Sequence, residues 1–256
     1  MEPRLRTDSG ERLTALRVAV TGGTTGLGLA LVRELLGRGA TVAFVARDRE
    51  RVVRVAREHV GTHGIVGDVA AKDDIYPISL QIVGRLGGLD VLVNNASSLG
   101  PTPLALLGDT ACEDFERALV TNVLGPFRLT KALLGALSAS ARERRGAVVL
   151  NVSSDAAMNP YPGWGAYGAS KAALQHLSRI WNEEVAAEGV RLLSLDPGDM
   201  DTPLHALAVP DADPATLKRP AVAAHELVDA IVAALPPRRG RGAAVSAPVT
   251  GAERCA

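Results

Sequence analysis

Residues 17–28 read RVAVTGGTTGLG, an apolar run that leads through a glycine-rich turn. The residues that follow, 26–38, place apolar side chains three and four positions apart, which is typical of a helix with one buried face. Gly22 and Gly26 can adopt backbone conformations that other residues avoid, and Gly28 lets the helix approach the strand. In this context the glycines favour a pyrophosphate site at the helix N-terminus over an ordinary turn.

Further apolar runs alternate with segments of helical period along the chain. Successive apolar positions, as in Val91-Leu92-Val93, are typical of parallel strands covered on both faces. Helical period recurs at residues 48–60 and 71–86. We predict an α/β fold, Rossmann-like, with a doubly wound parallel sheet and helices on both faces. The seven predicted strands are residues 17–21, 41–46, 64–67, 89–93, 147–152, 190–195 and 243–247.

The 256 residues fit one domain, because no linker, repeat or low-complexity block divides them. Hydrophobic residues make up 47% and charged residues 22%, which excludes the disordered and collagen-like classes. We expect a polar tail at residues 1–16 and a single domain at residues 17–256. Residues 199–220, rich in Pro, Asp and Ala, follow a strand and are predicted to form a long loop or lid.

Charge and composition argue against several kinds of partner. Lys+Arg and Asp+Glu are 28 each, without the basic excess of a nucleic-acid binder, so we expect the basic run 238–241 to cap the last helix. The opening segment lacks the apolar stretch of a signal peptide or membrane span, and we expect a cytoplasmic protein without membrane contact. Cys112 and Cys255 lie far apart, which argues against a disulfide framework. We expect no metal site at His59 and His63.

The end of the second strand selects between nicotinamide cofactors. An acidic residue about 20 positions beyond the glycines would bond the ribose hydroxyls of NAD, but this chain has Arg47 there. A guanidinium suits the 2′-phosphate of NADP, and Asp48 is expected to be the N-cap of the following helix. We predict NADP, with NAD as the alternative; Arg47 as a solvated loop charge is the other interpretation.

Tyr167 and Lys171 lie four residues apart in a segment of helical period and so share one face. A phenol with a pKa near 10 can act as an acid or base at neutral pH only if its phenolate is stabilised, and a lysine ammonium does this. Ser154 follows a predicted strand, where its hydroxyl can hold a carbonyl oxygen. Pairs of Tyr and Lys are also common in surface packing, so the spacing alone is weak evidence.

In combination these residues resemble the short-chain dehydrogenase/reductase superfamily over residues 17–247. The motifs agree in order along the chain. They are TGxxxGxG at 21–28, the adenine-side acid at Asp68-Val69, NNAG at Asn94-Asn95-Ala96, the tetrad Asn122, Ser154, Tyr167 and Lys171, and PG at Pro197-Gly198.

The resemblance implies an oxidoreductase that transfers hydride between NAD(P), with NADPH favoured, and a ketone or secondary alcohol. Tyr167 would transfer the proton, Ser154 would polarise the oxygen, Lys171 would bond the nicotinamide ribose, and Asn122 would hold a water that links Lys171 to solvent. It also implies a homodimer or homotetramer through the helices at 111–137 and 166–188. The implied cofactor-binding residues are Gly22, Thr24, Thr25, Gly26, Leu27, Arg47, Asp68, Val69, Asn95, Ala96, Tyr167, Lys171, Pro197, Gly198 and Thr202.

The chain departs from the family pattern at three places. Ser97 replaces the last glycine of NNAG, which narrows the cofactor channel slightly. The glycine turn lacks the family's basic residue, which leaves Arg47 as the main candidate for a 2′-phosphate. Asp199 and Asp201 stand beside the nicotinamide motif, and we expect them to cap the next helix, with substrate binding as the alternative.

The sequence says less about the substrate than about the cofactor or the catalytic residues. Aromatic and apolar side chains near the tetrad predict an apolar cleft, with subunit packing or the core of a loop as an equal alternative. Two other functions use the same fold: a nicotinamide-binding module without turnover, and a lyase or epimerase that regenerates its cofactor. Net consumption of cofactor separates them from an oxidoreductase. The predicted cleft residues are Met158, Tyr161, Trp164, Met200 and Leu204.

Overall fold

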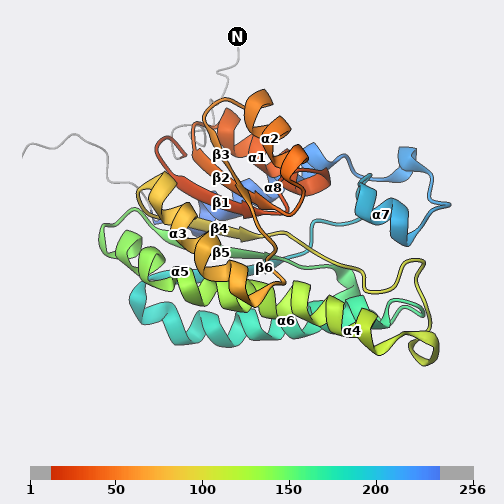
Figure 1. Cartoon of the computed structure of the whole chain (residues 1–256). Helices are drawn as coiled ribbons and strands as arrows, with labels where there is room; N and C mark the ends of the chain where they lie inside the picture. Colours follow the sequence, from red (N-terminus) through yellow and green to blue (C-terminus); the bar gives the residue numbers. More distant parts are fainter. Residues whose placement is uncertain (1–12, 237–256) are drawn as a thin grey trace, which may run out of the picture.

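The computed structural model describes residues 13–236, which form a parallel sheet between two layers of helices (Figure 1). The strand order is β3-β2-β1-β4-β5-β6, and each strand lies within two residues of a predicted one. The predicted α/β, Rossmann-like fold is therefore confirmed. The predicted seventh strand, the basic run 238–241 and Cys255 lie outside the described residues. The strands are β1 (Arg17–Thr21), β2 (Thr41–Ala46), β3 (Thr62–Val66), β4 (Val91–Asn94), β5 (Ala147–Val152) and β6 (Val190–Leu195).

Each face of the sheet carries its own core, because successive side chains of a strand point to opposite faces. Val18 and Val20 of β1 pack into the first core, and Ala19 between them packs into the second. The first core is closed by α1 (Gly26–Gly37), α2 (Arg49–Glu58) and α8 (Pro220–Ala234). The second is closed by α3 (Ile75–Leu86), α5 (Gly125–Arg142) and α6 (Gly165–Val185).

The predicted helix over 111–137 is interrupted in the structure. It consists of α4 (Cys112–Leu119), a π-helical turn η3 (Val120–Leu124) and the start of α5. A π turn inserts one residue into the helical repeat, and such turns are frequent at functional sites. The remaining short elements are η1 (Lys72–Asp74), η2 (Leu107–Asp109), η4 (Asp155–Ala157), η5 (Ala186–Glu188), α7 (Pro203–Ala208) and η6 (Pro214–Thr216).

Two helix starts test the expected capping residues. Asp48 is the N-cap of α2, as predicted, and its side chain accepts a hydrogen bond from Arg51 N at 3.0 Å. The expectation that Asp199 or Asp201 caps the next helix is wrong. Thr202 is the N-cap of α7, because its hydroxyl oxygen accepts from His205 N at 3.2 Å.

Residues 199–220 follow β6 and lead into α8, which packs against the first core of the sheet. The two ends of this segment pair with each other: Asp201 N donates to Lys218 O (3.1 Å), and Lys218 N donates to Asp199 O (3.0 Å). The Lys218 ammonium also donates to Pro197 O (3.0 Å) and to Glu226 (2.8 Å) of α8. The predicted loop is thus a segment that carries α7 and whose two ends are joined by backbone hydrogen bonds.

The described chain begins to pack before the predicted boundary at residue 17. Leu13 and Leu16 are buried in the first core, so the polar tail does not extend to residue 16. In residues 13–236, no helix combines the length and apolar character that crossing a membrane requires.

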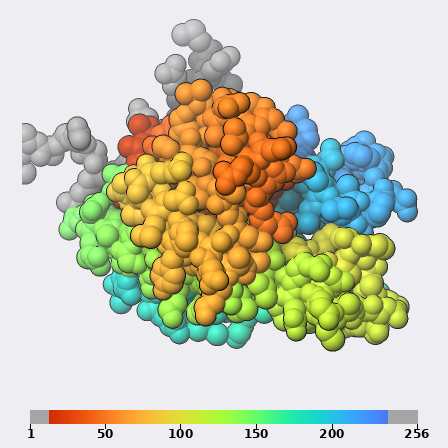
Figure 2. Space-filling view, in the orientation of Figure 1, coloured from red at the N-terminus to blue at the C-terminus, as the bar shows by residue number. Residues whose placement is uncertain are grey.

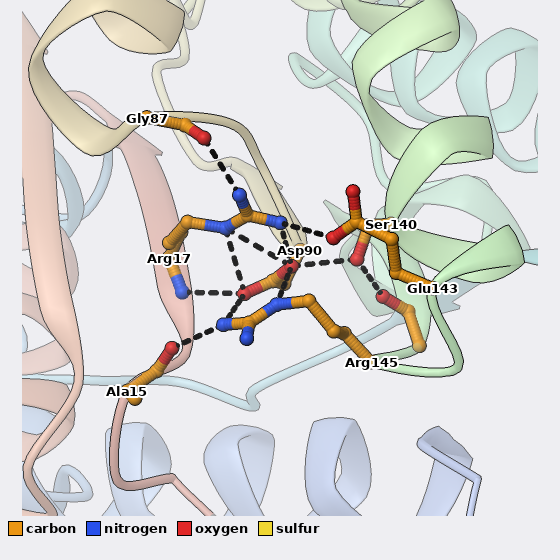
Figure 3. Close-up of polar contacts among 8 residues, drawn as sticks. Ala15, Arg17, Gly87, Asp90, Ser140, Glu143 and Arg145 are labelled. Carbon is orange, nitrogen blue, oxygen red and sulfur yellow. Dashed lines mark hydrogen bonds and ion pairs between the residues drawn. The ribbon is translucent and has the colours of Figure 1, made fainter.

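A buried ionic cluster joins the elements at the amino ends of the strands (Figure 3). Asp90, fully buried before β4, pairs with Arg17 of β1 at 2.7 Å and with Arg145 before β5 at 3.0 Å. Its carboxylate also accepts from Ser140 of α5 at 2.6 Å. Burial raises the pKa of Asp90, but the hydrogen bonds from Arg17, Arg145 and Ser140 outweigh it and lower that pKa to about 2.

Candidate active site

A cavity of about 880 Å³ opens at the carboxyl ends of the strands. The strand order reverses at β1, which pairs with β2 on one side and β4 on the other, and ligands of such sheets bind in the crevice at this point. The cavity extends from the glycine turn past the ends of β2 and β5 to α7. In Figure 2 the segment that carries α7, in blue, lies beside the surface of the N-terminal part of the chain, in orange.

The glycine turn brings bare backbone to the cavity. Gly22 and Gly26 have φ values of +70° and +50°, which other residues rarely adopt. A Cβ on Gly28 would lie 2.1 Å from Gly22 O, so this close approach of α1 to the strand requires glycine. The turn and the first residues of α1 line the cavity, an arrangement that fits phosphates at a helix N-terminus.

Asn95 and Ala96 hold the ends of β1 and β4 together beside this turn. The backbone N–H groups of both residues donate to the Thr21 hydroxyl at 3.0 Å, and Asn95 Nδ2 donates to Thr21 O at 2.9 Å. The Asn95 amide is therefore committed to the backbone of β1. Both residues also line the cavity, as the cofactor prediction requires.

Arg47 lies at the far end of the cavity from Tyr167, after β2. Its side chain is 75% exposed, and its guanidinium is 3.9 Å from the carboxylate of Asp68, which follows β3. An exposed pair at this distance contributes little to stability, so Arg47 is available to a ligand. Arg51, from the first turn of α2, lines the same part of the cavity and was missed in the sequence. Its signal was its place in the first turn of the helix that begins directly after Arg47 and Asp48.

Tyr167, Lys171 and Ser154 line the other end of the cavity together. Tyr167 and Lys171 lie one turn apart on α6 and are buried, and the Lys171 ammonium is 5.4 Å from the centre of the Tyr167 ring. Lys171 Nζ also donates to Val152 O, at the end of β5, at 2.7 Å. Ser154 Oγ donates to Asp155 at 3.1 Å and accepts from Ala156 N at 3.2 Å.

Burial shifts the pKa values of Tyr167 and Lys171 in opposite directions. Burial raises the pKa of Tyr167 to about 12, although hydrogen bonds with Ser154 and Ser97 work to lower it. Burial lowers the pKa of Lys171 to about 8, and the negative charge of Asp196 opposes this. At neutral pH Tyr167 is therefore a phenol and most Lys171 side chains are ammonium ions.

Asn122 is buried on the π turn η3, where all its polar atoms have protein partners. Its Oδ1 accepts from Ser98 N (2.8 Å) and from Ser97 Oγ (3.1 Å). Its Nδ2 donates to Ser98 O (2.8 Å) and to Ser170 Oγ (2.8 Å). The sequence placed Asn122 at the site and singled out Ser97 beside the cofactor channel, but it missed the contacts of Asn122 with Ser97, Ser98 and Ser170, because they depend on the π turn.

The apolar wall beside Tyr167 matches part of the predicted cleft. Trp164 packs edge-on against Tyr167, with ring centres 5.7 Å apart, and Leu204 of α7 packs on the same cluster. Tyr161 lines the cavity as well, and its hydroxyl donates to Asp155 at 2.7 Å. Met200 is a lining residue too. Met158 was predicted wrongly: it is 69% exposed and lies outside the lining.

A family model and several known proteins match this chain. The model of the short chain dehydrogenase family matches residues 17–213. The 2-(R)-hydroxypropyl-CoM dehydrogenase of Xanthobacter autotrophicus is 31% identical over 73% of this chain and 76% of its own length. The L-fucose dehydrogenase of Rattus norvegicus is 33% identical over 77% of this chain and 71% of its own length.

A solved structure agrees with these relatives. The short chain dehydrogenase of Shigella flexneri, complexed with NADP, superposes with a TM-score of 0.76 at 26% identity, over 83% of this chain and 89% of that one. Family model, relatives and fold therefore agree with the geometry of the site. The chain belongs to the short-chain dehydrogenase/reductase family and is a dehydrogenase that acts on CH–OH groups with NAD(P).

Proposed function

We propose that this enzyme interconverts a ketone and a secondary alcohol with NADPH as its preferred cofactor, and that Tyr167 is the general acid/base. One observation carries the proposal: the hydroxyls of Tyr167 and Ser154 and the ammonium of Lys171 share a cavity with the glycine turn. Both curated relatives are dehydrogenases by name, and the Shigella flexneri structure holds NADP, which supports the same reaction class.

The residues present fit a dinucleotide. Positive φ values at Gly22 and Gly26, and the lack of room for a Cβ at Gly28, leave backbone as the surface that phosphates would meet. When bound, the cofactor supplies or accepts the hydride. The residues proposed to hold it are Gly22, Thr24, Thr25, Gly26, Leu27, Arg47, Asp68, Val69, Asn95, Ala96, Tyr167, Lys171, Pro197, Gly198 and Thr202, all of which line the cavity.

In the reducing direction, Tyr167 gives its proton to the carbonyl oxygen of the substrate. Its raised pKa keeps it a phenol at neutral pH, and the ammonium of Lys171 stabilises the phenolate that remains. Ser154 donates a hydrogen bond to the same oxygen, for which its proton turns away from Asp155. In the oxidising direction the phenolate removes the proton from the alcohol.

Cofactor preference follows from Arg47. In an Arg47→Ala variant we expect NADPH to bind about 10- to 100-fold more weakly, because charge-assisted hydrogen bonds to the 2′-phosphate are lost, while NADH binding is unchanged. Titration followed by nicotinamide fluorescence measures both. The matched control is Arg54→Ala on α2. Arg54 is exposed, its guanidinium lies 4.0 Å from Glu58, and it does not line the cavity. Tighter binding of NADH than NADPH by the unmodified enzyme contradicts the proposed preference.

The substrate end of the cavity favours a carbonyl compound with an apolar body. Tyr167 belongs to one apolar cluster with Leu99, Leu104, Trp164 and Leu204. We propose that residues 199–220 act as the lid, since they supply Leu204. Among ketones that the enzyme reduces with net consumption of NADPH, those with an apolar group near the carbonyl should be preferred. A lyase or epimerase would consume no cofactor.

A Trp164→Ala variant tests this wall. We expect KM for such a ketone to rise about tenfold with a smaller change in kcat, because an apolar contact made equally in the ground and transition states is lost. Steady-state kinetics measure both constants. Met158→Ala, on the same loop but outside the cavity, is the control. An unchanged KM in Trp164→Ala would assign this tryptophan to packing alone.

The assembly as a homodimer or homotetramer and the cytoplasmic location stay predictions. So does the extent of the domain, for which we propose residues 17–256 with the addition of the buried residues Leu13 and Leu16.

A further inference from the structure

We infer that Lys218 is a positioning residue for the nicotinamide half of the cofactor, and that it acts through the turn Pro197-Gly198. The Lys218 ammonium donates to Pro197 O at 3.0 Å, from 21 positions further along the chain. The turn lines the cavity, whereas Lys218 does not. The inference rests on the proposed function, because it concerns the place where hydride is transferred.

The turn Pro197-Gly198 lies beside the groups proposed to hold the reacting oxygen. β6 pairs in parallel with β5 as far as the last residue of each strand, where Leu195 lies opposite Val152. The chain therefore leaves β6 next to Ser154, and the turn and Ser154 line the same cavity. Hydride transfer requires the nicotinamide close to the carbon whose oxygen Ser154 binds. This turn is therefore the backbone surface proposed to hold the nicotinamide.

Lys218 supplies three of the hydrogen bonds that shape the chain after β6. Its ammonium binds Pro197 O, its backbone N–H donates to Asp199 O at 3.0 Å, and its carbonyl accepts from Asp201 N at 3.1 Å. Between these bonds Gly198 has a φ of +78°, and a Cβ added there would lie 3.6 Å from the Lys218 ammonium. The ammonium is thus close to both residues of the turn.

The ammonium also joins the turn to the packed body of the fold. It donates to Glu226 of α8 at 2.8 Å, and the neighbouring residues Leu227 and Val228 are buried in the first core. The side chains of Lys218 and Glu226 are 34% and 54% exposed, so this ion pair contributes little to stability. The Lys218 side chain is therefore expected to fix where the turn lies more than to hold the fold together.

The test compares two ligands of the full chain that differ at the nicotinamide end. ADP-ribose 2′-phosphate carries the adenosine, the 2′-phosphate and the pyrophosphate of NADPH, but it lacks the nicotinamide ring. In Lys218→Met, which leaves the backbone bonds of residue 218 in place, we expect NADPH to bind about tenfold more weakly, since a charge-assisted hydrogen bond to the turn is lost. We expect the affinity for ADP-ribose 2′-phosphate to change less than about twofold. Nicotinamide fluorescence measures the first affinity, and competition against NADPH measures the second.

The comparison separates position from charge, because loss of an ammonium weakens both ligands alike through their shared phosphates. Lys218→Arg keeps a charged donor and is expected to recover most of the NADPH affinity. At saturating NADPH, kcat for ketone reduction should fall about tenfold in Lys218→Met while KM for the ketone stays within about twofold, because misplacement affects the chemical step. Lys72→Met, on η1 and outside the cavity lining, is the matched control.

Unchanged NADPH affinity and kcat in Lys218→Met overturn the inference. Equal weakening of both ligands also overturns it, because Lys218 would then act on the whole cavity or through its charge alone. If the unmodified enzyme binds NADH more tightly than NADPH, NADH and ADP-ribose take the place of the two ligands. Failure of the unmodified enzyme to bind either nicotinamide cofactor overturns the proposed function instead.

Discussion

Replacement of Tyr167 by phenylalanine is expected to lower kcat for ketone reduction by about 10²- to 10⁴-fold, the range that a positioned general acid contributes. The variant keeps the ring that packs against Trp164 and removes only the hydroxyl proposed to transfer the proton. Pre-steady-state measurement of NADPH oxidation separates the chemical step from product release.

The loss should be confined to proton transfer. NADPH affinity and the melting temperature of Tyr167→Phe should stay close to those of the unmodified enzyme. Tyr76→Phe on α3, where the ring is 72% exposed, controls for the loss of a phenol elsewhere. A rate within threefold of the original would assign the proton to another group.

The largest effect on stability is expected for Asp90→Asn. The substitution removes the buried charge that pairs with Arg17 and Arg145, and leaves the partly exposed Glu143, 3.9 Å from Arg17, as the remaining carboxylate near these guanidinium groups (Figure 3). Breaking a buried pair by removing one partner costs about 3–5 kcal/mol in the free energy of unfolding, and urea denaturation followed by circular dichroism measures it. Asp114→Asn breaks the exposed pair with Arg117 and should cost less than about 1 kcal/mol.

The Asp90 contribution also depends on pH. Its pKa is about 2 in the folded protein against an ordinary value of 3.8, so the folded state favours the carboxylate. This linkage contributes about 2 kcal/mol, which is fully present above pH 4 and disappears as the pH falls from about 4 to 2. The stability difference between the unmodified enzyme and Asp90→Asn should shrink over that interval, and a difference independent of pH would contradict the assigned cause.

The strands and the glycine turn could be predicted because their signals are local. Apolar runs mark buried parallel strands, and glycine marks backbone that no side chain can replace, as the 2.1 Å approach at Gly28 shows. The tetrad residues could be placed because they match the motifs of the family in order along the chain, and the structure brings Ser154, Tyr167 and Lys171 to one cavity.

Other features depend on tertiary contacts and carry no local signal. A helical pattern over 111–137 cannot reveal the π turn that points Asn122 at Ser98. The choice of Thr202 over its acidic neighbours as N-cap is made by where the chain turns into α7. Leu13 is buried only because the first core reaches past the strand, and Asp90 becomes the centre of a cluster only when distant arginines converge on it.

The backbone pairing at the two ends of the segment around α7 lets this segment vary without moving the rest of the fold. The segment leaves and returns through backbone hydrogen bonds of Asp199 and Asp201 with Lys218, so its two ends stay adjacent whatever lies between them. Insertions, deletions or a whole replacement of residues 203–217 therefore need not shift the register of the strands. If the segment is the lid proposed above, grafting another segment between these ends should change the substrate range while the glycine turn and the sheet keep their places.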